Sequence, residues 1–369
     1  MLTRLRALIV KEFLAILRDK RSRMVLIVPP MVQMIVFSFA ATQDVKNVSM
    51  GILDKDSGEH SRELTQRFQD ARAFRHLVWL KGTREIAPLM DSQDAILVMV
   101  IPSDFSRKIE AGKSVSVQLI LDGRRSNAAQ IVQGYAFRII EQFNRETAKA
   151  SGRRLPPNQL VSRNWFNPNL FFTWHTVPSL IGILTTLIGL IVTGLSVARE
   201  RELGTFDQLL VSPLKPLEIV LGKTIPAFVL SFGEGMVILT VAIFGFRVPL
   251  NGSLVLLLFS LSVFLLSIIG VGLFISSLAR TQQQAVLGAF TFMVPAMLMS
   301  GFATPIENMP RWLQIIAEAN PLKHFMILVK GIYLKDMSLS LVAVNVWPIA
   351  VIALFTLGGA SWLFMRRLE

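Results

Sequence analysis

The sequence predicts an α-helical polytopic membrane protein with six transmembrane helices and an inserted extracytoplasmic α/β domain. Of its 369 residues, 52% are hydrophobic and only 17% are charged, a composition too apolar for an ordinary soluble domain. Long apolar runs lie on both sides of one extended region, residues 42–176. Within that region short apolar runs alternate with amphipathic segments, which is the pattern of a sheet covered by helices.

Six apolar segments are long enough to cross a hydrocarbon core of about 30 Å, which takes about 20 residues of helix. Pro29 and Pro30 lie in the first segment, and we expect them to kink it. Glu234 lies inside the third. The predicted spans are residues 24–41, 177–198, 225–246, 254–279, 285–303 and 341–364.

The distribution of Lys and Arg near the span ends predicts the orientation. Basic residues are concentrated in the N-terminal segment, residues 1–23, and in the loop after the second span, residues 199–223. We therefore expect both segments and both chain termini on the cytoplasmic side of the cell inner membrane, with residues 42–176 outside. The supporting residues are Arg4, Arg6, Lys11, Arg18, Lys20, Arg21, Arg23, Arg199, Arg201, Lys215 and Lys223.

The first span could instead be read as a cleavable signal peptide, because a charged start, an apolar run and the small residues of "SFAA" (38–41) resemble one. Residues 1–23 argue against this reading, since they carry their own amphipathic helical pattern (Leu5, Leu8, Ile9, Phe13, Ile16 and Leu17). Cleavage would also leave an odd number of spans. An uncleaved anchor after an N-terminal amphipathic helix is the prediction.

The external region, residues 42–176, is predicted to be a compact α/β domain with a return linker. Its alternation of strands and helices indicates a mixed or parallel sheet. The predicted strands are residues 48–54, 75–80, 94–102 and 114–122, and the predicted helices are residues 59–71, 84–90, 103–112 and 127–149.

No catalytic or metal-binding constellation is found in the sequence. "AGKSVS" (111–116) ends like a phosphate-binding loop, but Arg107 stands where the first glycine is required and the segment leads into a strand, so we interpret it as a turn. The chain has no cysteine, and its four histidines lack metal-ligand spacing. The net charge of +13 is explained by membrane flanks rather than by nucleic-acid binding.

The sequence of the loop at residues 199–223 has a more regular pattern than a simple charged connector would need. Gly204 is expected to break the helix that continues the second span. After it, Phe206, Leu209 and Leu210 form one apolar face, which predicts a short amphipathic helix along the membrane surface. Pro213 and Pro216 end this helix.

This loop resembles the cytoplasmic loop of type 2 ABC transporter permeases, the ABC-2 family. The pattern R-E-x-E-x-G-T-x-x-x-L-L-x-x-P, with a later E and G-K, is shared, the last two at Gly222 and Lys223. In that family the loop contains the coupling helix, which docks on a separate ATPase subunit that binds ATP and Mg²⁺. The resemblance therefore assigns ATPase coupling to Arg199, Glu200, Arg201, Glu202, Gly204, Thr205, Leu209, Leu210, Pro213 and Glu218.

The resemblance extends over the rest of the chain and implies the permease subunit of an ATP-driven exporter of an amphipathic, lipid-like or drug substrate. "GILDKDSGEHSRELTQRF" and "FNPNL" (166–170) are similar to the subgroup with a large extracytoplasmic domain between the first two spans. The chain is then half a transporter, completed by a second copy or a related permease, with a periplasmic adaptor as a further partner. It is expected to bind no cofactor itself.

Between the last two spans, residues 304–336 resemble the external re-entrant helices of the family. The candidate residues of this segment are Pro310, Trp312, Asn320, Pro321 and His324, and Lys323 is a local departure from the small polar residues common there. An interfacial anchor is the simplest role for Trp312, and a direct role in releasing substrate is the alternative.

Glu234 is the sharpest single candidate, because a carboxylate inside a span is costly and indicates function. It could contact a substrate in the transport pathway, carry a proton, or be a packing carboxylate between helices that Gly233 and Gly235 bring close. A proton-coupled secondary transporter using Glu234 is therefore the alternative function. A membrane anchor of a signalling or scaffold protein is a third, but it would not need the coupling-loop pattern.

Overall fold

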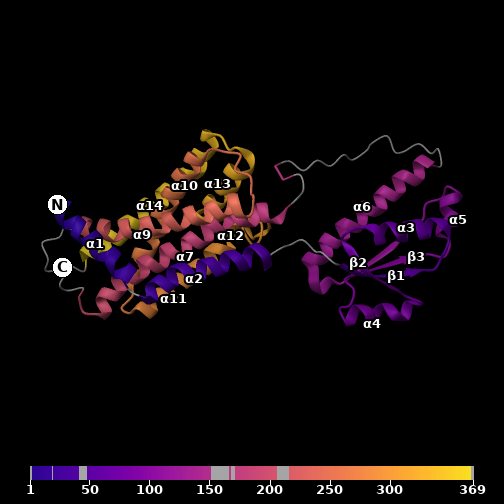
Figure 1. Cartoon of the computed structure of the whole chain (residues 1–369), viewed down its shortest axis with the longest axis horizontal. Helices are drawn as coiled ribbons and strands as arrows, with labels where there is room; N and C mark the ends of the chain where they lie inside the picture. Colours follow the sequence, from indigo (N-terminus) through magenta and orange to yellow (C-terminus); the bar gives the residue numbers. More distant parts are fainter. Residues whose placement is uncertain are drawn as a thin grey trace. The chain divides into compact units, whose positions relative to one another are not determined.

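The computed structural model describes residues 2–18, 20–40, 48–150, 166–167, 171–205 and 216–366. The chain divides into two compact units, which are described separately (Figure 1). The helical unit comprises residues 1–41 and 164–369, and the α/β unit comprises residues 42–163. The predicted external domain, residues 42–176, extends past this division to within the helix that starts at Phe172.

The helical unit is a bundle built around one long central helix, α7 (Phe172–Glu202), which is buried continuously from Thr176 to Gly194. Helices α2, α9, α10, α11 and α13 all pack against α7. The other elements of this unit are α1 (Leu2–Arg18), α2 (Lys20–Ala40), α9 (Pro216–Thr240) with the π-helical turn η3 (Val241–Gly245), α10 (Leu254–Leu278), α11 (Gln282–Leu298), the turn η4 (Ile306–Asn308), α12 (Arg311–Glu318), α13 (Pro321–Lys335) and α14 (Leu339–Arg366).

Four helical stretches are long and apolar enough to cross a membrane: Phe172–Glu202, Leu217–Gly245, Leu254–Leu278 and Leu339–Leu363. This helical unit is that of a polytopic membrane protein. The first and fifth predicted spans fall on α2, whose apolar stretch is Ile27–Phe37, and on α11, which has 17 residues. Helix α2 continues through Pro29 and Pro30. Whether α2 and α11 also cross the membrane stays a prediction.

The α/β unit contains a mixed four-stranded sheet in the order β2-β1-β3-β4. Strand β1 (Val48–Asp54) pairs in parallel with β2 (Phe74–Trp79) and β3 (Leu97–Ile101), and β4 (Gln118–Leu121) runs antiparallel to β3. The strands lie where the alternation of short apolar runs predicts them. The helices and turns of this unit are α3 (Glu59–Asp70), η1 (Thr83–Glu85), α4 (Ile86–Asp91), α5 (Phe105–Glu110), η2 (Gly123–Arg125) and α6 (Ser126–Ala150).

Successive strand residues alternate between two apolar layers, as the pleat requires. Met50, Ile52 and Met99 face a core completed by α3, α5 and α6, whereas Leu53 and Val98 face α4 on the other side of the sheet (Figure 1). Both faces of the central strands are thus covered, which explains why the β3 sequence is an unbroken apolar run.

The crevice expected where the strand order reverses, beyond the carboxyl ends of β1 and β3, is bridged by the protein's own polar groups. The Asp54 carboxylate accepts from the backbone of Asp56 and from Ser61 Oγ, and the Asp56 carboxylate accepts from both the backbone and the hydroxyl of Ser106. Burial acts to raise the pKa of Asp56, but these hydrogen bonds hold it below its ordinary value. The two carboxylates build the turn that fixes α3 and α5.

"AGKSVS" forms a helix end, as predicted. Gly112 has φ +76°, its N–H donates to the carbonyl of Ile109, and the N–H of Lys113 donates to that of Lys108. This arrangement closes α5 with a left-handed residue. A phosphate loop would instead open a helix, so this segment lacks the geometry that holds a phosphate.

Candidate functional site

The charged residues at the end of α7 tie that end to four other helices. Arg199, Glu200, Arg201 and Glu202 are consecutive, and an α-helix turns about 100° per residue, so their side chains leave α7 in four directions. We call the end of the helical unit where α7 ends and α9 begins the basal end, and the opposite end the distal end. The contacts of these four residues all lie at the basal end.

Glu200 belongs to a buried ion cluster that links α1, α7 and α9. Its carboxylate lies 2.6 Å from Lys11 Nζ and 2.8 Å from Lys223 Nζ, and Lys223 Nζ also lies 3.0 Å from Glu12. The Lys223 side chain is fully buried, and those of Glu200 and Glu12 are 7% and 8% exposed. Ser196 completes the cluster, accepting from Lys223 at 3.1 Å and donating to Glu12 at 3.0 Å.

This cluster can be buried because its charges compensate each other. Two ammonium groups face two carboxylates, so no described member carries an uncompensated charge. Removing a fully buried partner such as Lys223 is strongly destabilising, because the carboxylates left behind cannot recover their hydration, whereas the Lys11 side chain is 51% exposed and its removal costs less. The cluster therefore fixes the basal ends of α7 and α9 relative to α1.

The other three residues bind neighbouring helix ends. Arg199 Nη1 donates to the carbonyl of Ala15 in α1 at 3.2 Å. Arg201 Nη1 donates to the carbonyls of Ser277 and Ala279, each at 2.7 Å, at the carboxyl end of α10. The Glu202 carboxylate accepts from the backbone and side chain of Gln282, where α11 begins.

The charges of Arg201 and Glu202 match the ends of the helices that they bind. A guanidinium is favourable beside the exposed carbonyls at a helix carboxyl end, and a carboxylate is favourable beside the free N–H groups at an amino end. The α10–α11 connection is therefore fastened to α7 on both sides.

Gly204 ends α7, as predicted. It has φ +69°, its N–H donates to the carbonyl of Arg201, and the N–H of Thr205 donates to that of Glu200 at 2.9 Å. These two hydrogen bonds form a Schellman cap, which favours glycine because the left-handed conformation strains a residue with a Cβ. The Gly-Thr of the coupling-loop pattern is thus a helix terminator.

Gly222 and Lys223 form the matching contact on α9. A Cβ at Gly222 would lie 2.3 Å from Leu8 Cδ2 and 2.7 Å from Leu8 Cγ, so any larger residue would force the Leu8 side chain of α1 to move. One helical turn beyond Leu8, Glu12 then meets Lys223. The Gly-Lys of the pattern therefore serves as a docking point for α1.

Only part of the predicted coupling set lies in the described residues. Leu209, Leu210 and Pro213 fall in residues 206–215, outside them, as does Phe206. Glu218 is 3% exposed at the start of α9. The structure thus places Arg199 to Glu202, Gly204 and Thr205 where the loop begins and Glu218 where it ends.

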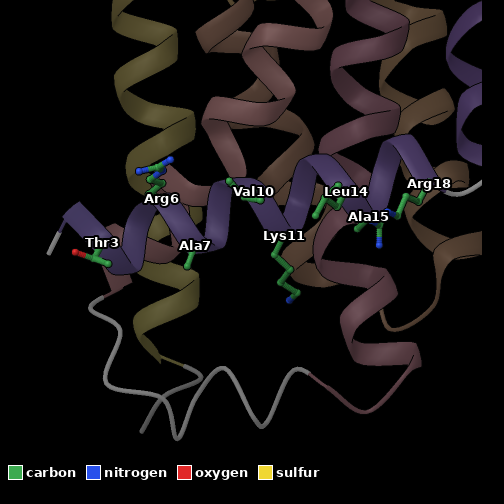
Figure 2. A pocket seen from close by; sticks show the side chains of 8 residues that line it. All are labelled: Thr3, Arg6, Ala7, Val10, Lys11, Leu14, Ala15 and Arg18. Carbon is green, nitrogen blue, oxygen red and sulfur yellow. The ribbon is translucent and has the colours of Figure 1, made fainter.

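Helix α1 presents two different faces. Leu8, Glu12 and Ile16, spaced four residues apart, are buried. The other face borders a shallow groove of about 900 Å³, and two of its residues, Lys11 and Ala15, also contact α7 (Figure 2). The residues of this outward face, which are basic, apolar and small, are Thr3, Arg6, Ala7, Val10, Lys11, Leu14, Ala15 and Arg18.

Glu234 lies in α9, within a membrane-crossing stretch. Both of its carboxylate oxygens are buried, and neither has a hydrogen-bond partner among the residues that the structure describes. Ser231 Oγ, one turn away on α9, is also buried without a hydrogen-bond partner among the described residues. The described residues therefore include no neighbouring helix donor for this carboxylate, and the choice between a functional and a packing role stays a prediction.

The candidate residues after α11 form a helix–turn–helix at the distal end. Pro310 precedes α12, and Pro321 opens α13 after Asn320, whose side chain accepts from the N–H of Leu322 at 3.1 Å and caps the helix. Asn320 Nδ2 also donates to the carbonyl of Ala296 in α11 at 2.7 Å. Asn320 thereby fastens α13 to α11.

His324 and Trp312 differ in their surroundings. His324 is buried and its Nε2 lies 2.9 Å from the carbonyl oxygen of Glu318, at the end of α12. Trp312 is 62% exposed, as an interfacial anchor would be. His324 therefore helps to join α12 to α13 rather than standing alone.

Sequence reasoning did not identify Glu12 or Ser196, although both lie in the buried cluster. A signal was present for Glu12: it stands midway between Leu8 and Ile16 on the stripe that faces the bundle. A charged residue on the buried stripe of an amphipathic helix needs a buried partner. That partner, Lys223, is 211 residues away, too far for any local pattern to reveal it.

Known proteins match this sequence over nearly its whole length. A family described as "ABC-2 family transporter protein" matches residues 20–362. "Probable multidrug ABC transporter permease YbhR" of Escherichia coli strain K12 is 48% identical over 368 residues, covering 100% of this chain and 99% of that protein. "Probable multidrug ABC transporter permease YbhS" of the same strain is 31% identical, covering 99% and 97%.

A third relative, "Inner membrane transport permease YhhJ" of Escherichia coli strain K12, is 28% identical over an alignment of 365 positions that covers 95% of this chain and 92% of that protein. The family match spans nearly the whole chain, and the YbhR relative aligns from end to end. The chain therefore belongs to the ABC-2 family of transporter proteins.

Proposed function

We propose that the chain is the membrane-spanning permease subunit of an ATP-binding cassette exporter, moving an amphipathic, lipid-like or drug substrate across the inner membrane. Its family supports this role, as do the names of two relatives, each printed as "Probable multidrug ABC transporter permease". ATP and Mg²⁺ bind to a separate ATPase subunit in this proposal, and the chain itself binds no cofactor and has no enzymatic activity.

The main observation in support of the proposal is the ion cluster, whose residues Glu200 and Lys223 flank residues 206–215 in the sequence. Glu200 precedes that segment and Lys223 follows it, and the two side chains meet at 2.8 Å. A force applied to the segment would therefore reach α7 and α9 through a paired, buried contact. Through Glu12 and Lys11 it would also reach α1.

The outward face of α1 is proposed to share the ATPase contact. Its opposite face is held to the ends of the coupling loop by Leu8 and Glu12. Arg6, Val10 and Leu14 of the outward face are exposed. A mixed basic and apolar strip of this kind suits a protein interface, in which arginine and apolar anchors contribute most.

The membrane topology follows from the same proposal. With α2 and α11 added to the four long apolar helices, the chain crosses the membrane six times. The basal end and both termini are then cytoplasmic, the α/β unit is extracytoplasmic, and residues 304–336 re-enter from outside. Two such chains, identical or related, enclose the pathway, and the α/β unit recruits a periplasmic adaptor.

The test is to reconstitute the chain in lipid nanodiscs with its candidate ATPase subunit and to measure subunit binding and ATP hydrolysis. Leu209→Ala and Leu210→Ala are each expected to weaken ATPase binding by about tenfold, the usual loss for an apolar anchor of an interface. Leu339→Ala, which truncates a leucine 68% exposed at the distal end, is the matched control. If the wild-type chain binds no ATPase subunit, the exporter proposal fails.

A proton-coupled secondary transporter remains the second candidate, because the Glu234 oxygens are buried without a described partner. Glu234→Gln keeps the shape of the side chain but cannot carry a proton. We expect the variant to insert normally and to transport at an altered rate. Transport that needs a proton gradient in wild type and loses that need in Glu234→Gln would favour this candidate, and unchanged transport would show that Glu234 has no role in it.

A further inference from the structure

A second polar contact lies at the distal end of the helical unit, far along α7 from the ion cluster. Lys330 of α13 places its Nζ 2.9 Å from His175 Nε2, in the first turns of α7, and 3.4 Å from the carbonyl oxygen of Gly301. The sequence motifs give no role to His175 or to Lys330, which lies within residues 304–336. The two residues are 155 positions apart.

Lys330 has no counter-charge in the described part of the chain. The residue is half-buried, and both of the contacts of its ammonium are neutral acceptors. By contrast Lys323, on the same helix, pairs with Glu318. Removing an ammonium from water is costly unless an opposite charge compensates, so the surroundings of Lys330 favour an anion from outside the chain.

His175 adds an unused donor to the same place. Since Nε2 accepts from Lys330, the neutral ring carries its proton on Nδ1. His175 Nδ1 is buried and has no hydrogen-bond partner among the described residues. A buried N–H without an acceptor costs free energy, and an anionic oxygen is an acceptor that would satisfy it.

Aromatic rings lie beside His175. The His175 ring stacks on Phe172, with centroids 6.0 Å apart, and on Phe302, at 6.5 Å. Phe37, near the end of α2, meets Phe302 edge to face at 6.4 Å. A ligand with an acidic group and an apolar body would therefore find both parts of its chemistry here.

We propose that Lys330 and His175 bind the anionic head group, a phosphate or carboxylate, of an amphiphile at the distal end of the bundle. Lys330 Nζ supplies the charge and His175 Nδ1 a second hydrogen bond. The amphiphile is either an acidic phospholipid or an exported acid. Binding does not depend on the proposed ATPase partner, and only the statement that this end is external rests on the proposed function.

The experiment measures ligand-induced shifts in the melting temperature of the purified full chain without any ATPase subunit. The probes are dihexanoyl phosphatidylglycerol, octanoate and, as a zwitterionic comparison, dihexanoyl phosphatidylcholine. We expect at least one acidic probe, but not phosphatidylcholine, to raise the melting temperature in a concentration-dependent manner. A response to phosphatidylglycerol indicates a lipid head group, and a response to octanoate alone indicates a free acid.

Lys330→Met should weaken binding of the acidic probe by about tenfold or more, since it removes a charge-assisted hydrogen bond. Lys323→Met is the matched control and should keep the wild-type response. Lys330→Arg, which retains the charge, should restore most of the binding and shows that a loss in Lys330→Met is not misfolding. The proposal is overturned if neither acidic probe shifts the wild-type chain, or if Lys330→Met responds as the wild type does.

Discussion

Lys223→Met is expected to lower the free energy of unfolding of the helical unit by about 3–5 kcal/mol, the usual cost of breaking a buried ion pair. Methionine fits the space of the lysine but leaves Glu12 and Glu200 buried without their shared partner. Thermal or denaturant unfolding of the purified chain in detergent measures the loss. In nanodiscs the variant should also lose substrate transport coupled to ATP hydrolysis.

Two further variants separate charge pairing from packing. Lys11→Met removes a lysine whose side chain is 51% exposed, so the cost should stay within about 1 kcal/mol. The triple change Lys223→Met, Glu12→Met and Glu200→Met replaces the pairs by apolar groups and should recover most of the stability. If the triple variant is no more stable than Lys223→Met alone, unpaired charge is not the cause of the loss.

Asn320→Ala is expected to lower the free energy of unfolding by about 2–3 kcal/mol, combining a lost helix cap with a buried carbonyl left without its donor. The carbonyl is that of Ala296, and the cap is that of α13. The variant should loosen the distal end, seen as faster amide hydrogen exchange in α13. ATPase binding at the basal end should not change.

Gln314→Ala is the control for Asn320→Ala. Gln314 Nε2 also donates to backbone carbonyls, those of Met309 and Glu307, but the residue is only half-buried. Its loss should cost about 1 kcal/mol or less, because water can replace the donor. Equal losses in both variants would contradict a special role for Asn320.

Local pattern was enough to predict the elements of the α/β unit. β1 occupies residues 48–54, and α6 covers residues 126–150 where a helix over residues 127–149 was expected. Each prediction needed only a run of neighbouring residues, because the two periodicities of strand and helix are local properties. The Gly204 helix end was predictable for the same reason.

The contacts that make the candidate site were not predictable in this way. Leu17 belongs to the apolar pattern of the N-terminal helix, yet it is 47% exposed, whereas Glu12 is buried. Which side of α1 packs on α9 depends on Gly222 and Lys223, more than two hundred residues away. Likewise, nothing near His175 in the sequence indicates Lys330. Periodicity predicts which face of a helix is apolar, but not which other helix packs against that face.

The four-way attachment of Arg199 to Glu202 has a consequence for the length of α7. His175 and Arg199 lie on one helix, about 36 Å apart at 1.5 Å of rise per residue. Inserting or deleting one residue between them would turn one end relative to the other by about 100°. All four basal side chains would then miss their partners together, so the contacts at the two ends of α7 do not permit a change in its length.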